Sequence, residues 1–170
     1  MTTVQPAEIL LDETDFVILA CLQSDATMTN VELAKKIGFS PSACLSRTRR
    51  LRETGVIRSY AAILDEEKVG LEVVTYVFVC LSPHDRTTTE AFLARIREIP
   101  SITECHNISG VHDYLLKIVA PSMHAYRDFV IDTLIEVPGV GEVESSVVLS
   151  TEKQSFQLPL AESKLWKSRS

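Results

Sequence analysis

One predicted helix carries four arginines within six residues: Arg47, Arg49, Arg50 and Arg52. The helix is expected to begin at Ser40-Pro41, because serine is a preferred N-cap and proline fits the first helical position. Guanidinium groups bind phosphates and guanine edges, and short polar side chains let a helix approach a groove closely. The chemistry that these residues indicate is therefore binding to double-stranded DNA.

The spacing along this helix separates a core face from a DNA face. Cys44, Thr48 and Leu51 recur at i, i+4 and i+7 and are expected to face the core. The free amides of the first turn are suited to holding a phosphate. We interpret residues 56–64 as a short β-wing that directs Arg58 towards the DNA backbone. The predicted DNA contacts are Ser40, Ser42, Ala43, Ser46, Arg47, Arg49, Arg50 and Arg58.

Two shorter predicted helices position the arginine-rich one. The first begins at Asp12, whose carboxylate can cap the helix, and Asp15 follows three residues later. The second begins at Thr29 with Glu32 in a capping box, and it stops at Gly38. A short helix, a glycine turn and an arginine-rich third helix are typical of a helix-turn-helix. A solvated helix face is the alternative reading of the arginines, which the agreement of caps, turn and wing disfavours.

The distribution of charge supports this reading, although the total charge argues against it. The chain of 170 residues has 17 basic and 23 acidic residues and a formal net charge of −6. Residues 1–64 hold seven of each, so the deficit of six lies wholly in residues 65–170. Within residues 35–58 there are seven basic residues and one acidic residue. We infer a small DNA-binding unit joined to an acidic one.

The rest of the chain predicts the order β-α-β-β-α-β of a ferredoxin-like fold. The expected strands and helices cover residues 73–81, 88–98, 102–108, 114–120, 123–135 and 140–149. The fold class is therefore α+β, with a winged helix-turn-helix domain followed by a ferredoxin-like domain. The expected boundaries are 10–64 for the first domain, 65–72 for a linker, 73–153 for the second domain and 154–170 for a C-terminal extension. We expect residues 161–170 to be disordered; contact of Lys164, Trp166, Lys167 and Arg169 with DNA or a partner is the alternative.

With these elements in place, the chain resembles the leucine-responsive/asparagine-responsive (Lrp/AsnC) family of prokaryotic transcription regulators from about Leu10 to Leu160. The resemblance rests on Leu11-Asp12-x-x-Asp15-x-x-Ile18-Leu19, Asn30-Val31-Glu32-Leu33-Ala34, Gly38-x-Ser40-Pro41-x-x-Cys44-x-x-Arg47-x-Arg49-Arg50-Leu51, Ser109-Gly110-x-x-Asp113-Tyr114, Met123-x-x-Tyr126 and Pro138-Gly139-Val140. It implies a DNA-binding regulator that forms dimers through the second domain, assembled into octamers as tetramers of dimers. A cytoplasmic, nucleoid-associated location follows from the same resemblance.

The resemblance also implies an amino-acid effector bound between dimers, near the Gly-x-x-Asp-Tyr turn. An effector ammonium is expected at Asp113 and an effector carboxylate at the backbone amides around Gly110. The alternative is that Asp113 pins the turn and Met123 is a core residue. The predicted effector-binding residues are Ile108, Gly110, Asp113, Tyr114, Met123, Ser146, Val147 and Val148.

Other functions are disfavoured by what the sequence lacks. The four histidines and four cysteines show no paired zinc-ligand spacing, and no nucleophile motif, P-loop or GxGxxG occurs. We therefore expect no enzyme activity, no metal and no cofactor apart from the effector. No apolar run is long enough for a membrane helix, and the first residues do not form a secretory signal. A low-specificity architectural DNA-binding protein and an amino-acid sensor without an operator are the remaining alternatives.

Overall fold

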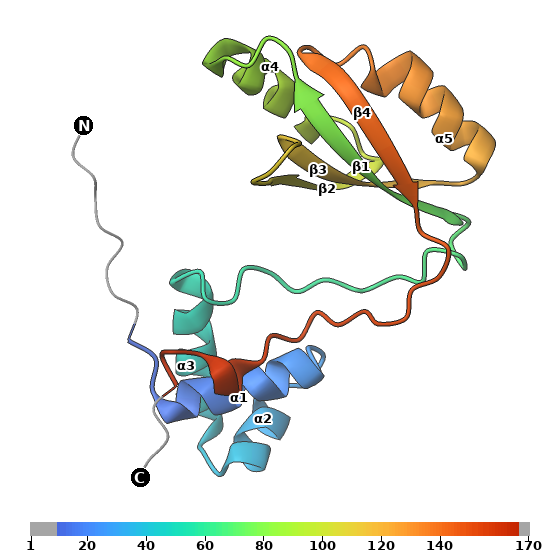
Figure 1. The fold of residues 1–170 in the computed structure, drawn as a ribbon. Coiled ribbons are helices and arrows are strands. Elements are labelled where there is room, and N and C mark those ends of the chain that lie inside the picture. Colours follow the sequence, from blue (N-terminus) through green and yellow to red (C-terminus); the bar gives the residue numbers. More distant parts are fainter. Residues whose placement is uncertain (1–9, 167–170) are drawn as a thin grey trace. The chain divides into compact units, whose positions relative to one another are not determined.

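The computed structural model describes residues 10–166 and divides the chain into two compact units. One, which we call the helical unit, comprises residues 10–62 together with 153–166. The other, the sheet unit, comprises residues 63–152. Figure 1 follows the chain from the blue helices through the green-to-orange sheet and back to the red C-terminal segment. The helical unit is thus built from both ends of the chain.

Three helices form the first part of the helical unit: α1 (Glu13–Ser24), α2 (Asn30–Ile37) and α3 (Pro41–Glu53). Their caps agree with the sequence. Asp12 and Thr29 each make a reciprocal capping box, and the Ser40 side chain accepts from the amide of Ala43. Gly38 ends α2 with φ of +72°, a left-handed conformation that glycine adopts without a Cβ clash.

The three helices bury one apolar cluster. Cys44 and Leu51 of α3 are fully buried against Ile18 of α1 and Leu33 of α2, as their helical spacing predicts. Thr48 is only half-buried. Burial raises the pKa of the Cys44 thiol, so this cysteine is a packing residue and not an exposed nucleophile.

The segment predicted to form a β-wing does not form a strand. Residues 56–64 contain no helix or paired strand, although Ile57 donates its amide to the carbonyl of Leu51 and so stays attached to α3. A strand needs a hydrogen-bonded neighbour, and the described part of the helical unit offers none. The guanidinium of Arg52 lies 5.8 Å from the ring centre of Tyr60, a cation–π contact that holds this segment near α3.

The C-terminal extension packs on α1, which makes the expectation of disorder wrong for residues 161–166. Leu160 begins a 3₁₀ turn, Leu160–Glu162, and packs against the cluster of the helical unit. The ring of Trp166 meets that of Phe16 edge to face, with 4.9 Å between centroids. Gln23 at the end of α1 accepts from the amide of Leu158 at 2.8 Å. Lys167 and Arg169 lie outside the described residues.

The sheet unit has the predicted β-α-β-β-α-β order. Its elements are β1 (Val73–Leu81), α4 (Arg86–Arg97), β2 (Ile102–Asn107), β3 (Tyr114–Ala120), α5 (Met123–Phe129) and β4 (Val140–Val147). The strands form one antiparallel sheet in the order β2-β3-β1-β4. The long predicted helix 123–135 is present, but its last part, Val130–Leu134, winds as a π-helix.

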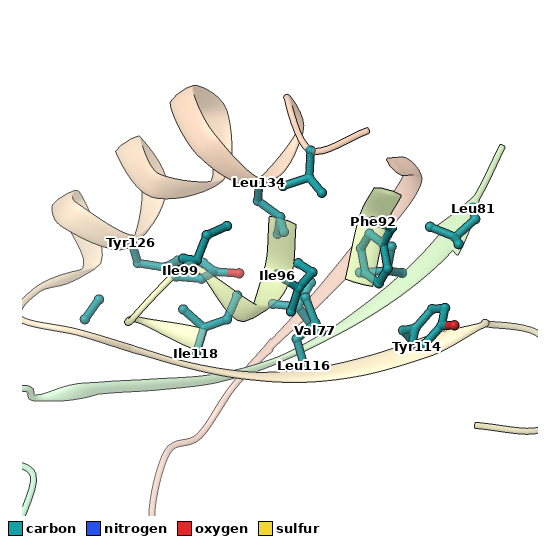
Figure 2. Close-up of a cluster of buried hydrophobic side chains, with 13 residues drawn as sticks. Val77, Leu81, Phe92, Ile96, Ile99, Tyr114, Leu116, Ile118, Tyr126 and Leu134 are labelled. Carbon is teal, nitrogen blue, oxygen red and sulfur yellow. The ribbon is translucent and has the colours of Figure 1, made fainter. Parts of the chain in front are cut away.

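Both helices of the sheet unit cover one face of the sheet (Figure 1). Alternate residues of β1 are buried there, Val77 and Val79 completely, as the period of two in a strand requires. Figure 2 shows Phe92 and Ile96 of α4 and Leu134 after α5 above Leu116 and Ile118 of β3. The Tyr126 hydroxyl donates to the Ser145 hydroxyl at 2.6 Å and links α5 to β4.

Candidate functional site

The outward side of α3 presents a stripe of two short polar residues and one arginine, all three among the residues that the sequence predicts to contact DNA. Ser42, Ser46 and Arg49 are exposed at i, i+4 and i+7, opposite the buried Cys44 and Leu51. Arg49 donates from Nε to Glu53 at 2.7 Å, but its side chain is 77% exposed, so this ion pair is weak and exchangeable. Ala43 is half-buried, so it is at the edge of this surface.

Arg47 and Arg50 lie on a different side of α3, where they contact acidic residues of α1 and its cap. Arg47 Nη1 donates to Asp12 Oδ2 at 2.7 Å and to Asp15 Oδ1 at 2.9 Å. Arg50 Nη2 pairs with Asp15 Oδ2, and its Nη1 donates to the carbonyl of Leu10 at 3.3 Å. Two of the arginines predicted to contact DNA are therefore held within the helical unit.

These ion pairs change the electrostatics of the helix start. Partial burial alone would raise the pKa of Asp12, but the amide of Asp15 and the guanidinium of Arg47 outweigh it and lower the pKa. The same contact, led by the hydrogen bond to Asp12, raises the pKa of Arg47. Asp12 and Arg47 are consequently both charged at neutral pH.

Exposed residues beside the stripe extend the candidate DNA surface. Arg58, predicted as a backbone contact, is exposed in the segment after α3. Leu45 is 53% exposed on α3, on the side that faces Tyr60 across an open groove. An exposed leucine of this kind can contact a thymine methyl group. This contact was not predicted from the sequence, because a leucine in a helix ordinarily indicates a core position.

In the sheet unit, Asp113 has the structural contacts that the alternative reading of the turn predicts. Its Oδ2 accepts from the amide of Leu81 at 2.8 Å, and Oδ1 lies 3.3 Å from His84 Nδ1. Tyr114 is buried, with its ring 4.9 Å from that of Phe92. Met123, by contrast, is 50% exposed and is not a core residue.

The eight predicted effector-binding residues divide between two ends of the sheet. Ile108, Gly110, Asp113 and Tyr114 lie at the β2–β3 turn, next to the end of β1 at Leu81. Ser146, Val147 and Val148 pair with the start of β1, as does the end of β3 that leads to Met123. Thr75 and Leu81 are six residues apart on β1, which corresponds to ~20 Å. One protomer therefore does not bring all eight into one pocket.

The partners of the arginines on α3 could not be predicted from the sequence. The sequence pattern indicates only a capping role for Asp15, because its pairing with α3 depends on how the helices pack. The described residues contain no group of three or more His, Cys, Asp or Glu side chains arranged to hold a metal ion. Within residues 10–166, no helix combines the length and apolar character needed to cross a membrane.

Family models match both units and define the class of protein. A model described as winged helix-turn-helix DNA-binding matches residues 11–58, and one described as Lrp/AsnC ligand binding domain matches residues 74–158. A DNA-binding module followed by a ligand-binding module is the composition of a ligand-responsive transcription regulator.

Relatives along nearly the full chain agree. Transcriptional regulator AzlB of Bacillus subtilis is 48% identical over 154 residues, which cover 91% of this chain and 98% of that protein. The leucine-responsive regulatory protein of Escherichia coli K12 is 39% identical over 148 residues, which cover 87% and 90%. The chain belongs to the Lrp/AsnC family of DNA-binding transcriptional regulators, and it is not an enzyme.

Solved structures give the same result for the fold. A transcriptional regulator from Neisseria meningitidis, crystallised as a complex with L-Met, superposes with a TM-score of 0.84 and 39% identity. The match covers 88% of this chain and 97% of that one. LrpC of B. subtilis matches with a TM-score of 0.76 and 31% identity, over 86% and 100%.

Proposed function

We propose that this chain is a sequence-specific regulator that reads the major groove with α3 and changes its DNA binding or assembly when a small effector, an amino acid, binds the sheet unit. The observation that carries the DNA part is the exposed stripe of Ser42, Ser46 and Arg49 opposite the buried Cys44 and Leu51. Ser40 with the first-turn amides and Arg58 act on the phosphate backbone. Two such helices in a dimer enter successive major grooves ~34 Å apart.

Self-association is part of the proposal, because the face of the sheet opposite the helices carries partly exposed apolar side chains among charged ones. Tyr76 and Phe78 of β1 and Leu115 of β3 are half-buried on the face opposite the helices, where His112 stacks against Phe78. A second copy of this face buries these side chains. We propose the dimer on this basis, and an octamer as four such dimers.

The proposed effector site lies between protomers. The residues of the turn around Gly110 come from one copy, and the residues around Met123 and Ser146 come from another. Together they supply the two halves of the effector site, which a single sheet holds apart. Gly110 is exposed with φ of +134°, so backbone amides beside it are accessible to a carboxylate. The L-Met in the N. meningitidis regulator supports an amino acid as the ligand class.

The test of DNA reading uses the full chain and a duplex enriched by it from a random-sequence pool. Arg49→Ala is expected to weaken binding to that duplex by about tenfold or more, since a base or phosphate contact of this kind is worth ~1–3 kcal/mol. Arg86→Ala is the matched control, because Arg86 makes the same Nε contact of 2.7 Å, to Glu90, on the exposed side of α4. Equal affinities of wild type and Arg49→Ala would refute the role of α3.

The test of the effector measures thermal unfolding of the full chain with each of the twenty amino acids. A ligand at 100 times its Kd stabilises the folded state by ~2.7 kcal/mol. Met123→Ala and Ser146→Ala are expected to abolish this stabilisation while leaving the unliganded transition close to wild type. The amino-acid role fails if no amino acid stabilises the wild type.

A further inference from the structure

The carboxylate of Asp15 is the centre of the contact between α1 and α3. Its side chain is 1% exposed, although aspartate is rarely buried without compensation. Oδ1 accepts from Arg47 at 2.9 Å, and Oδ2 accepts from the amide of Asp12 at 3.1 Å and from Arg50. The buried charge is therefore fully hydrogen-bonded, and each donor is needed for that.

This network restrains Arg47 and Arg50 from contact with DNA. Two carboxylates and two guanidiniums balance at this place, so it offers no surplus positive charge to a phosphate. If either arginine swung out to DNA, a buried carboxylate would lose a charged partner, which is strongly unfavourable. Arg49, whose only partner among the described residues is exposed Glu53, has no such restraint.

The same network fixes the rotation of α3. Arg47 and Arg50 are three residues apart, so they attach one side of the helix at two levels to a single point on α1. Ser42, Ser46 and Arg49 lie on a neighbouring side of the helix, and a hydrogen bond to a base edge is lost when the atoms move by less than 1 Å. The orientation of the stripe of Ser42, Ser46 and Arg49 towards DNA thus depends on Asp15.

We propose that Asp15 is the positioning residue of the DNA-reading helix, and that Arg47 and Arg50 act through it and not by touching DNA. This inference rests on the proposed function and revises two of the contacts predicted from the sequence. It separates three of the four arginines of α3 into one that meets DNA, Arg49, and two that hold the helix, Arg47 and Arg50.

The experiment compares full-length Asp15→Asn, Arg50→Gln and Arg58→Gln with the wild type. Binding to the enriched duplex and to a scrambled duplex is measured by fluorescence anisotropy over a series of KCl concentrations. Loss of a phosphate contact lowers the slope of log K against log[salt] by ~1, so Arg58→Gln is expected to show that change. Asp15→Asn and Arg50→Gln are expected to keep the wild-type slope.

The preference for the enriched duplex over the scrambled one is the second readout. We expect Asp15→Asn and Arg50→Gln each to lower this ratio about tenfold or more, because the stripe of Ser42, Ser46 and Arg49 is no longer held in its orientation. The double variant Asp15→Asn/Arg50→Gln is expected to lose no more of this preference than either single variant, since both substitutions act through one contact. Arg50→Lys is expected to restore part of the preference, because lysine keeps the charge.

Three results would overturn the inference. The first is a lower salt slope in Arg50→Gln, like that expected of Arg58→Gln. The second is a higher affinity of Asp15→Asn for both duplexes, which would mean that two arginines had been released to bind DNA. The third is additive losses of duplex preference in the Asp15→Asn/Arg50→Gln double variant. Circular dichroism confirms folding, and if Asp15→Asn unfolds the helical unit, the Arg50 variants decide. If the wild type itself does not distinguish the two duplexes, the proposed function is contradicted. Failure of the proposed function is thereby distinguished from failure of the inference about Asp15.

Discussion

Replacing Trp166 with alanine tests whether the C-terminal extension is a structural part of the helical unit. A fully covered tryptophan removes ~150–250 Å² from water, so the half-buried ring of Trp166 removes ~100 Å², worth ~2.5 kcal/mol. Its edge-to-face contact with Phe16 adds ~0.5–1.5 kcal/mol. Chain entropy recovered by the freed extension offsets part of this. We expect a net loss of ~2 kcal/mol.

Hydrogen exchange of the full chain, followed by mass spectrometry, localises the effect. A loss of ~2 kcal/mol in local opening free energy speeds exchange of α1 amides about 30-fold, and peptides from β1 and β3 serve as the internal reference. Leu165→Ala is the matched control, because Leu165 is a neighbouring apolar residue that is 46% exposed, and its removal is expected to change stability by less than ~0.5 kcal/mol. Unchanged α1 exchange in Trp166→Ala, or an equal effect in Leu165→Ala, would refute the reasoning.

Three further outcomes are expected. Asp113→Ala leaves the amide of Leu81 without its acceptor and should destabilise the sheet unit by ~1–3 kcal/mol in thermal unfolding without any effector; an unchanged midpoint would remove its structural role. Gly38→Ala places a Cβ at φ of +72° and should cost ~1 kcal/mol in denaturant unfolding, with no change in the m-value. The pKa of Asp12 is lower in the folded than in the unfolded chain, so its stabilisation is present above about pH 4 and disappears as the pH falls through the folded pKa. Asp12→Asn should therefore flatten the acid limb of stability against pH, and an acid limb as steep as that of the wild type would contradict this.

Local chemistry made most of the helical unit predictable. The capping pairs Asp12–Asp15 and Thr29–Glu32 and the glycine after α2 act within a few residues of one another, so the sequence alone locates the helix ends. The order of strands and helices in the sheet unit was predictable for a similar reason, because periodicity and β-propensity act along short segments. The same rules misread residues 56–64, since β-branched residues favour a strand that forms only where a partner exists.

What the sequence did not reveal depends on contacts between distant residues. Arg50 and Asp15 are 35 positions apart, and only the packing of α3 on α1 turns a predicted DNA contact into a buried ion pair. The division of the effector residues between two ends of the sheet follows from strand register, which motif positions do not encode. Trp166 was read as part of a disordered tail because nothing near it in the sequence indicates that Phe16 is its partner.

The return of the C-terminal segment to α1 has a consequence for biosynthesis. A ribosome releases α1 to α3 early, but Leu160 and Trp166 emerge only after the whole sheet unit has been made. The helical unit is thus begun before the sheet unit and completed after it, and a chain that terminates before Trp166 lacks the ring that packs against Phe16. Completion of the helical unit therefore follows translation of the ligand-binding part, so a chain that includes Leu160 and Trp166 has an advantage in stability over one that lacks them.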